Sequence, residues 1–245
     1  MILPYGLGRR ISPLDIKNYR LTDFIPPKKL DTSGSRVWEF LADPLDQSLG
    51  MPVEKQGHCP GFCLANFGIN LPIQDNFTNA DAHRFYYMCK DFDNEPGMEN
   101  GSCMLSVAKT GKQLGLFGIY AFAQSIDEVS WWILNRGPVM VGTDWTIDMF
   151  TPDENNIIHP TGDVAGGHAY LLNEKNDAGY YHKQGSWNGW GIHGGAYISI
   201  EDFAILFRHG GEVIAVVEQP QSTAPDPKKS CITVFTNLFK GQYGN

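Results

Sequence analysis

The order of the sequence patterns predicts an α+β protein, in which a helical first half packs against a strand-rich second half. Apolar residues recur at helical spacing in residues 59–70, 81–91 and 102–114. After residue 137 the pattern changes to short β-branched and aromatic runs. Helices followed by strands are typical of the α+β class, and we expect a cleft where the halves meet.

Four helices are expected in the first half, which should begin near Trp38. The first is a buried helix that starts at Cys59, and the two other segments named above follow it. The fourth has Ser125 at its N-cap and Glu128 three residues later, which is the pattern of a capping box. This helix should end just before Pro138, because a residue that precedes proline avoids the helical conformation.

The second half should contain five short strands and one helix. We expect the strands at 138–142, 169–172, 180–184, 196–200 and 213–217. The helix should lie at 201–209, closed by two glycines before the last strand.

Length and composition predict one globular body with two appendages. The chain has 245 residues, 42% of them hydrophobic and 19% charged, which is enough to bury a full core. Both ends are rich in proline and lysine. We therefore predict an extended N-terminal arm at 1–36, a domain at 37–218, and a linker with a C-terminal tail at 219–245. The domain divides into a mainly helical half, 37–136, and a β-rich half, 137–218.

Net charge and hydropathy argue against two classes of partner. The formal charge of −8 is unsuited to gripping nucleic acid or an anionic membrane surface. No apolar run approaches the roughly 20 residues that span a bilayer. The first residues lack the charged leader and apolar core of a secretion signal. We expect a cytoplasmic or virion-associated protein.

The five cysteines predict neither a disulfide framework nor a metal site. Their number is odd and their spacing irregular, which favours free thiols in a reducing compartment. Cys59 and Cys63 are separated by three residues, but no second close pair of Cys or His completes a tetrahedral set. We expect no metal and no cofactor.

Two segments that are far apart in the sequence contain a cysteine and a histidine that could act as a nucleophile and its general base. Residues 56–65 read QGHCPGFCLA, which places Cys59 where a helix would start, and residues 166–172 read GGHAYLL. The unpaired N–H groups of a helix N-terminus favour a thiolate over a thiol. A histidine beside that sulfur would accept its proton, so we predict Cys59 as nucleophile and His168 as general base.

Three motifs in this order resemble the papain-like cysteine proteases. They are CPGF at 59–62, GGHAY at 166–170 and QGSWNGWG at 184–191, and the resemblance covers about residues 38–217. The short acidic chain is closest in style to bacterial and phage members. The resemblance implies a papain-like fold and hydrolysis of peptide bonds in a peptide or protein substrate.

The nucleophile has one alternative. If residues 52–57 are compared with the family's approach loop, Cys59 falls on a non-catalytic cysteine and Cys63 is left for the chemistry. That assignment needs one extra residue in the loop. Cys59 keeps the family's spacing from cysteine to Phe62 and places Pro60 in the first helical turn, where proline is well tolerated. These points favour Cys59.

The family stabilises the oxyanion with the backbone N–H of the cysteine and with a glutamine side chain. Gln56 lies only three residues before Cys59, which makes a tight loop, whereas Gln47 lies further back and requires a loop insertion. Insertions in surface loops are well tolerated. Both glutamines therefore remain candidates for the second donor to the oxyanion.

The chain departs from the family at the group that orients the histidine. The family has asparagine just before Ser-Trp, and this chain has Gly185, which offers no side-chain acceptor. Asn188 or Gln184 is a substitute close in sequence. An orienting group assists a Cys–His pair but is not indispensable, since a thiol is already acidic.

Three functions follow from these residues. The first is a cysteine peptidase that acts through Cys59 and His168. The second is a papain-fold binding protein of a larger assembly such as a virion, with weak or no catalysis, whose terminal arms bind protein partners. The third is a Cys–His amidase that cuts cell-wall peptides.

Two expectations concern the aromatic residues and the remaining histidines. Trp187 and Trp190 should cover a core or shield a hydrogen bond. Six histidines lack the setting of His168 and are expected at the surface, namely His58, His83, His159, His182, His193 and His209.

Overall fold

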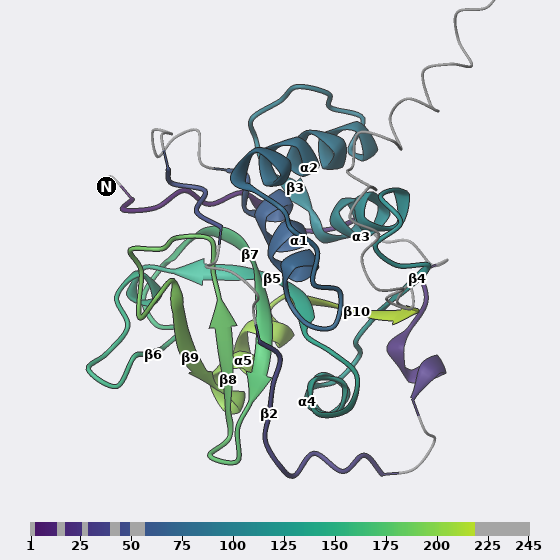
Figure 1. The fold of residues 1–245 in the computed structure, drawn as a ribbon. Helices are drawn as coiled ribbons and strands as arrows, with labels where there is room; N and C mark the ends of the chain where they lie inside the picture. The colour runs from purple at the N-terminus through teal and green to yellow at the C-terminus, as the bar shows by residue number, and fades with distance from the viewer. Residues whose placement is uncertain (1–2, 14–17, 26–28, 40–44, 50–56, 219–245) are drawn as a thin grey trace, which may run out of the picture.

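The computed structural model describes residues 3–13, 18–25, 29–39, 45–49 and 57–218. It confirms the predicted α+β class, because five α-helices pack around one large mixed sheet in the described part of the chain (Figure 1). Among these residues no helix is long and apolar enough to cross a membrane.

Three helices form the helical half and cover one face of the sheet (Figure 1). They are α1 (Cys59–Ile69), α2 (Asn79–Phe92) and α3 (Met104–Gln113), and each lies within two residues of its predicted bounds. Every residue of α1 is buried, since α2, α3 and the sheet enclose it. At the start of α2, Thr78 and Asp81 form a reciprocal capping box.

Helices α1 and α2 approach closely at Gly61, and this contact leads to a stability prediction. A Cβ at position 61 would overlap the backbone carbonyl oxygen of Ala82. An alanine in a free helix would stabilise it by about 1 kcal/mol. Because the overlap is with backbone, we expect Gly61→Ala instead to destabilise the protein by about 1–3 kcal/mol. Urea unfolding measures the difference, and an unchanged or raised midpoint would contradict the close approach.

The sheet has eight strands, and most neighbours are antiparallel. Its main path runs β4-β10-β5-β7-β8-β9-β6, and β2 pairs with β7 off that path. The strands are β2 (Arg36–Val37), β4 (Ile119–Phe122), β5 (Val139–Thr146), β6 (Ile157–Ile158), β7 (Val164–Lys175), β8 (Tyr180–Gln184), β9 (Gly195–Ser199) and β10 (Glu212–Glu218).

The central strands divide the core into two clusters, because successive side chains point to opposite faces. On β7, Ala169 and Leu171 pack against α1–α3, whereas Tyr170 and Leu172 join a second cluster. That second cluster includes α4 (Ile126–Asn135) and α5 (Ile200–Arg208). The sheet therefore separates the two groups of helices.

The structure refines three predictions. Strand β7 begins at Val164, so His168 lies within the strand and pairs with Thr143 of β5 rather than preceding the strand. Ser125 caps α4 by accepting the N–H of Glu128 at 3.2 Å, but the Glu128 carboxylate accepts from the Gln124 N–H rather than from the cap residue. Strand β4 was not predicted, since its four residues lack a clear alternation.

The described parts of the predicted arm lie against the domain. Strand β1 (Arg9–Arg10) pairs in parallel with β3 (Ser102–Cys103), and β2 pairs with β7. Between them the chain forms a 3-10 helix, η1 (Leu21–Phe24), and a second one, η3 (Asp148–Phe150), follows β5. Figure 1 shows the first residues crossing between the helices and the sheet. The predicted tail at 219–245 lies outside the described residues.

Candidate active site

Cys59 is the first residue of α1, with Pro60 after it, as the sequence predicts. The residue is fully buried, and its Sγ accepts the backbone N–H of Ala169 at 3.3 Å. Burial raises the pKa of the Cys59 thiol to about 12, although the N–H groups of Ala169, Gly8 and Arg9 lower it. The sulfur is therefore a protonated thiol near neutral pH in this arrangement.

Ala169, the residue after His168 on β7, donates its N–H to the Cys59 sulfur, whereas the His168 ring packs on the face of the strand that carries Tyr170. The ring stacks on Trp187 at a centroid distance of 4.1 Å and is fully buried. Within the described part of the chain, neither ring nitrogen has a hydrogen-bond partner, so no hydrogen bond joins His168 to Cys59. Burial, and then the nearby Lys183, hold the pKa of His168 well below its usual range. The imidazole is therefore neutral.

Cys63 has the surroundings of a core residue. It lies one turn further along α1 and is almost completely buried, and its Sγ donates to the carbonyl of Tyr170 at 3.0 Å. Burial raises the pKa of its thiol strongly. These contacts enclose Cys63 between the helix and β7, and Cys59 is buried to the same degree.

Of the two candidate glutamines, Gln47 lies in the described structure and Gln56 lies outside it. Gln47 is fully buried, and its Nε2 donates to the carbonyl oxygen of Gly6 at 2.9 Å. The Ser186 hydroxyl donates to its Oε1 at 2.9 Å, which fixes the orientation of the amide. The donor of Gln47 is thus aimed at a peptide carbonyl inside the site.

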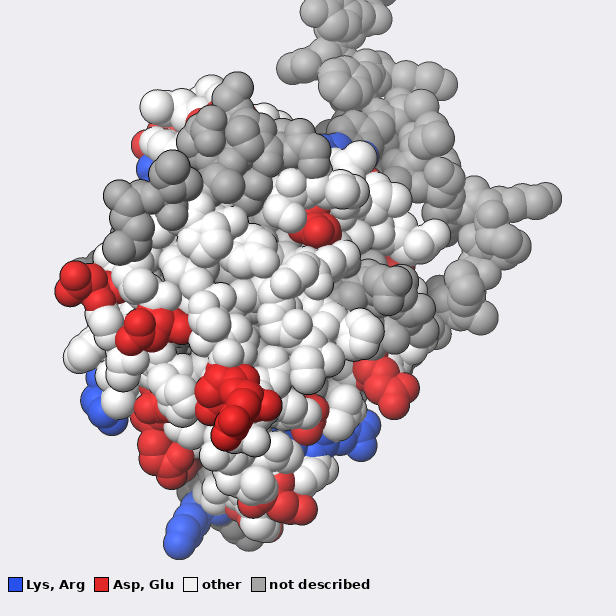
Figure 2. Space-filling view, turned by 90° about the vertical axis from the view of Figure 1, so that its left-hand side faces the viewer, with Lys and Arg blue, Asp and Glu red and all other residues white. Residues whose placement is uncertain are grey.

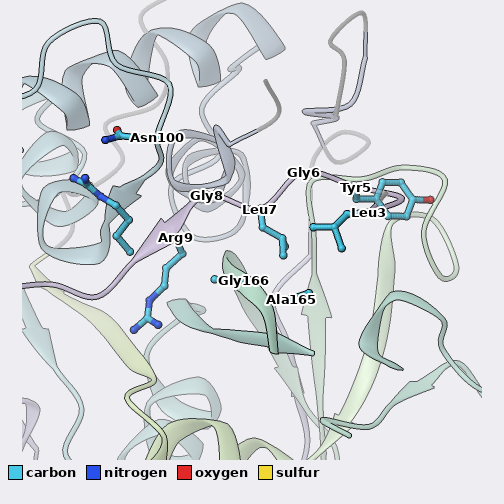
Figure 3. Close-up of a pocket in the computed structure, with 11 residues that line it drawn as sticks. Leu3, Tyr5, Gly6, Leu7, Gly8, Arg9, Asn100, Ala165 and Gly166 are labelled. Atoms are coloured by element: carbon cyan, nitrogen blue, oxygen red, sulfur yellow. The ribbon is translucent and has the colours of Figure 1, made fainter. Parts of the chain in front are cut away.

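The chain's own N-terminal segment, residues 3–10, passes over Ala165 and Gly166 of β7 (Figure 3), and the N–H groups of Gly8 and Arg9 interact with the Cys59 sulfur. The Gly8 N–H donates to the carbonyl of Gly167 at 3.0 Å, and a Cβ on Gly8 would overlap the backbone of Gly57. A Cβ on Gly167 would likewise overlap the carbonyl oxygen of Arg9. Further along the segment, Tyr5 stacks on Trp187 at 4.8 Å. The glycines at 8 and 167 are therefore needed for this close approach.

Arg9 anchors the segment in an acidic pocket. Its Nη2 donates to Glu212 at 2.9 Å and to the carbonyl of Gly210 at 2.5 Å, and its Nη1 lies 3.6 Å from Asp144. The side chain is only 1% exposed. Gly142 forms part of the wall, since a Cβ there would lie 3.0 Å from the Arg9 side chain. Figure 3 shows Arg9 pointing away from the segment toward the sheet. A buried guanidinium with two carboxylates is the strongest polar anchor in this segment.

Lys183 of β8 is a buried amine surrounded by aromatic rings. Its Nζ lies 4.0 Å from the centroid of Trp190, 4.8 Å from Trp145, 4.9 Å from Trp187 and 5.4 Å from Tyr170. A desolvated cation–π contact contributes about 2 kcal/mol, whereas burying an ion costs several kcal/mol. Burial lowers the pKa of Lys183 well below its ordinary value. The neutral amine is therefore the favoured form.

Gly185 and Lys183 compete for the same space. A Cβ at position 185 would overlap Lys183 Nζ. Asn188, one of the two predicted substitutes for the orienting asparagine, is exposed in the loop after Trp187 and forms no hydrogen bond to His168. The backbone carbonyl of Gly185 accepts from Asn66 of α1 at 3.4 Å.

The prediction that His58 lies at the surface is wrong. His58 is 1% exposed and stacks on Tyr86 at 3.8 Å. Its ring nitrogens contact His83 Nδ1 at 2.7 Å and Glu99 at 2.5 Å. Burial lowers the pKa of His58, and Glu99 opposes that shift. Its position just before α1 places it under α2, which sequence spacing does not reveal.

Two residues of the site were missed from the sequence. Arg9 lies in the segment that was predicted as an extended arm, and nothing local indicates that it enters a pocket. Lys183 carried a usable signal: strand alternation places it on the same face as the buried Tyr181. Among the described residues, no group of three His, Cys, Asp or Glu side chains is placed to hold a metal ion.

Comparisons with known proteins agree on the fold. No protein-family model matches the sequence, and no curated protein matches it. Among solved structures, the chain is similar to xylellain, a cysteine protease from Xylella fastidiosa, with a TM-score of 0.60 and 17% identity over 89% of this chain and 100% of that one.

Two further solved structures are similar. Procathepsin L 3 from the larval midgut of Tenebrio molitor has a TM-score of 0.55 and 14% identity, over 86% of this chain and 76% of that one. Procathepsin B S9 from Trypanosoma congolense has a TM-score of 0.56 and 11% identity, over 88% and 87%. The predicted resemblance is thus confirmed at the level of the fold, and the chain has the papain-like fold of these cysteine proteases.

Proposed function

We propose that the domain at 37–218 is a cysteine peptidase that hydrolyses peptide bonds through Cys59 and His168. One observation carries the proposal: a stretch of peptide already lies across Cys59, held by donors and acceptors suited to a peptide backbone. Gln47 donates to its Gly6 carbonyl, and Gly167 accepts from its Gly8 N–H. A surface that binds one extended peptide in this way is suited to binding another.

The chemistry follows from the same residues. His168 takes the proton of the Cys59 thiol, and the sulfur attacks the carbonyl carbon of the scissile bond. The Cys59 N–H and the Gln47 amide stabilise the resulting oxyanion. His168 then gives its proton to the leaving amine, and water, activated by the same imidazole, releases the acyl group and restores the thiol. These reaction steps need no cofactor.

The N-terminal segment holds the enzyme in a blocked state. It buries Cys59, which raises the pKa of the thiol, and the buried His168 has a pKa too low to carry a proton near pH 7. Both shifts oppose formation of a thiolate–imidazolium pair. Departure of the segment hydrates both groups, so the thiol pKa falls, the imidazole pKa rises, and the pair can form.

The pocket of Arg9 indicates the substrate class. Once the segment leaves, Glu212 and Asp144 line an empty acidic pocket beside Cys59. A substrate side chain with a guanidinium would restore both ion pairs. The face of the molecule shown in Figure 2 carries mainly acidic groups, and the chain has a net charge of −8. Such a field favours the approach of basic peptides.

Changing the charge of the pocket tests this preference. A hydrogen bond to a charged group contributes about 1.5–3 kcal/mol. We therefore expect peptides with arginine to be cleaved about tenfold or more faster, in kcat/KM, than matched norleucine peptides. In Glu212→Gln and in Asp144→Asn this ratio should fall toward one, and the ratio corrects for any change in overall activity. An undiminished ratio in both variants would contradict the assignment.

The proposal is tested by digesting a peptide library with the full chain carrying Arg9→Ala, which loosens the segment. We expect cleavage products in the mass spectrum, and faster loss of peptides that contain arginine.

A second candidate is a papain-fold binding protein without efficient catalysis, as part of a larger assembly. It is favoured by the absence of a hydrogen-bond partner for the His168 ring among the described residues, and by Gly185. A folded Arg9→Ala chain that binds peptides but leaves the whole library intact would support this candidate.

A further inference from the structure

Two buried polar groups beside Cys59 share one aromatic enclosure. His168 and Lys183 both border the rings of Trp145, Trp187 and Tyr170. Within the described residues, neither the imidazole nitrogens nor Lys183 Nζ have a hydrogen-bond partner. Because buried polar groups in native proteins are nearly always paired, two complementary unpaired groups in one enclosure call for a common explanation.

Gly185 makes room for the lysine amine. A Cβ at this position would overlap Lys183 Nζ where it now lies, so a larger residue at 185 requires the end of the lysine side chain to move. Position 185 is the one at which the sequence resemblance leads us to expect an asparagine that orients the histidine. The lack of a side chain at position 185 therefore leaves the space that the Lys183 amine occupies.

We propose that Lys183 is the positioning residue for the His168 imidazole, with its amine in the place of a side chain at 185. The inference rests on the proposed role of His168 as the general base.

The chemistry requires both groups in their neutral forms. A neutral imidazole has one N–H donor and one lone pair, and a neutral amine can accept that N–H, which an ammonium cannot. A hydrogen bond from this N–H to Lys183 Nζ, which the described structure does not contain, would leave the lone pair of the other nitrogen for the Cys59 proton. The pKa of Lys183 lies well below its ordinary value and that of His168 is also lowered, so both are neutral near pH 7.

No neighbouring group described in the enclosure carries a negative charge that would stabilise Lys183 as an ammonium ion. Among the described residues, His182 also interacts with Lys183 and is neutral, because burial, and then Lys183, lower its pKa to about 4. The other titratable groups that interact with Lys183 or His168 from the packed elements are Cys59 and Cys63 of α1 and Tyr170 of β7. Burial raises the pKa of all three, so each is uncharged near neutral pH. A neutral amine therefore leaves the whole enclosure uncharged.

A matched pair of substitutions separates positioning from packing. Gln and Met at 183 have similar size, but only glutamine offers an acceptor. In the full chain labelled with ¹⁵N-histidine, the His168 signals are assigned by their loss in His168→Gln. We expect one tautomer in the wild type and in Lys183→Gln, and a mixture in Lys183→Met. The single tautomer persisting in Lys183→Met, or the same mixture in both variants, would overturn the proposal. Thermal melts confirm that each variant is folded.

A second test moves the polar side chain from position 183 to position 185. Lys183→Ala should lose the single tautomer, and adding Gly185→Asn should restore it, because the asparagine then has the room that the amine occupied. In chains that also carry Arg9→Ala, the same addition should raise kcat/KM about tenfold over Lys183→Ala. A double variant no better than Lys183→Ala in either measurement would refute the inference. The tautomer is read without turnover, so loss of the proposed peptidase activity is a separate outcome.

Discussion

Replacing Cys59 by alanine should abolish peptide hydrolysis in the full chain that carries Arg9→Ala. Without the sulfur no acyl-enzyme can form, and the remaining oxyanion donors cannot supply a nucleophile. The loss should reach the detection limit, at least about 10³-fold in kcat/KM. Labelling by iodoacetamide at residue 59, measured by mass spectrometry of tryptic peptides, should vanish with it.

Cys63→Ala is the matched control, because it removes a second buried thiol from the same helix. We expect this variant to keep its activity and its labelling at Cys59. It should lose some stability, since Sγ bonds to the Tyr170 carbonyl in the core. If the Cys63 variant is the one that loses activity and labelling, the choice of nucleophile is wrong. If neither substitution affects cleavage, the Cys–His mechanism is wrong.

Arg9→Ala should release the N-terminal segment and activate the site. Removing one partner of a buried ion pair costs about 3–5 kcal/mol. Here the loss weakens docking of the N-terminal segment on the domain. A loss of about 3 kcal/mol corresponds to a roughly hundredfold larger population of molecules in which the segment is undocked. The rate of Cys59 alkylation and the rate of peptide cleavage should both rise by up to this factor, measured on the full chain at constant pH.

Arg10→Ala is the control within the same strand. Arg10 has a side chain that is 35% exposed and binds Glu95, which is 33% exposed, and Asp93, which is 3% exposed. Both carboxylates also pair with Lys90, so removing Arg10 leaves neither without a cation. Alkylation of Cys59 in Arg10→Ala should therefore stay close to the wild-type rate. Equal activation by both substitutions would show that general weakening of the segment matters, and not the Arg9 pocket. No activation by Arg9→Ala would show that the segment does not block Cys59.

Regular elements with strong periodicity were predictable from the sequence. Helices α1, α2 and α3 and strands β8 and β10 lie close to their expected bounds, because the local spacing of apolar residues indicates them. Strand β4 was missed, since a four-residue strand is determined by its partner β10 rather than by its own pattern. The start of β7 was placed too late, because pairing with β5 extends the strand through a glycine pair.

The candidate site was predictable in part. Cys59 at a helix start and His168 between glycines and apolar residues are local patterns; the fold brings Ala169, the residue after His168, to the Cys59 sulfur, and the Cys–His pair itself stays a prediction. Gln47 lies in the site, where its amide contacts Gly6 and Ser186, whereas Gln56 lies outside the described residues, so the choice between the two glutamines stays a prediction. His58 was misplaced, because the covering helix α2 lies some twenty residues away in sequence.

The amino-acid sequence by itself determined the α+β class, the helix that carries Cys59, the strand that carries His168 and the resemblance to papain-like proteases. These depend on spacings of a few residues, which local sterics and hydrophobic periodicity translate directly into structure. Only the tertiary structure decided that Arg9 lies between Glu212 and Asp144 and that Lys183 occupies the space beside Gly185. Arg9 and its carboxylates are far apart in the chain, and Lys183 meets its rings only once β5, β7 and β8 are paired, so burial and contact at these positions arise only when the core closes.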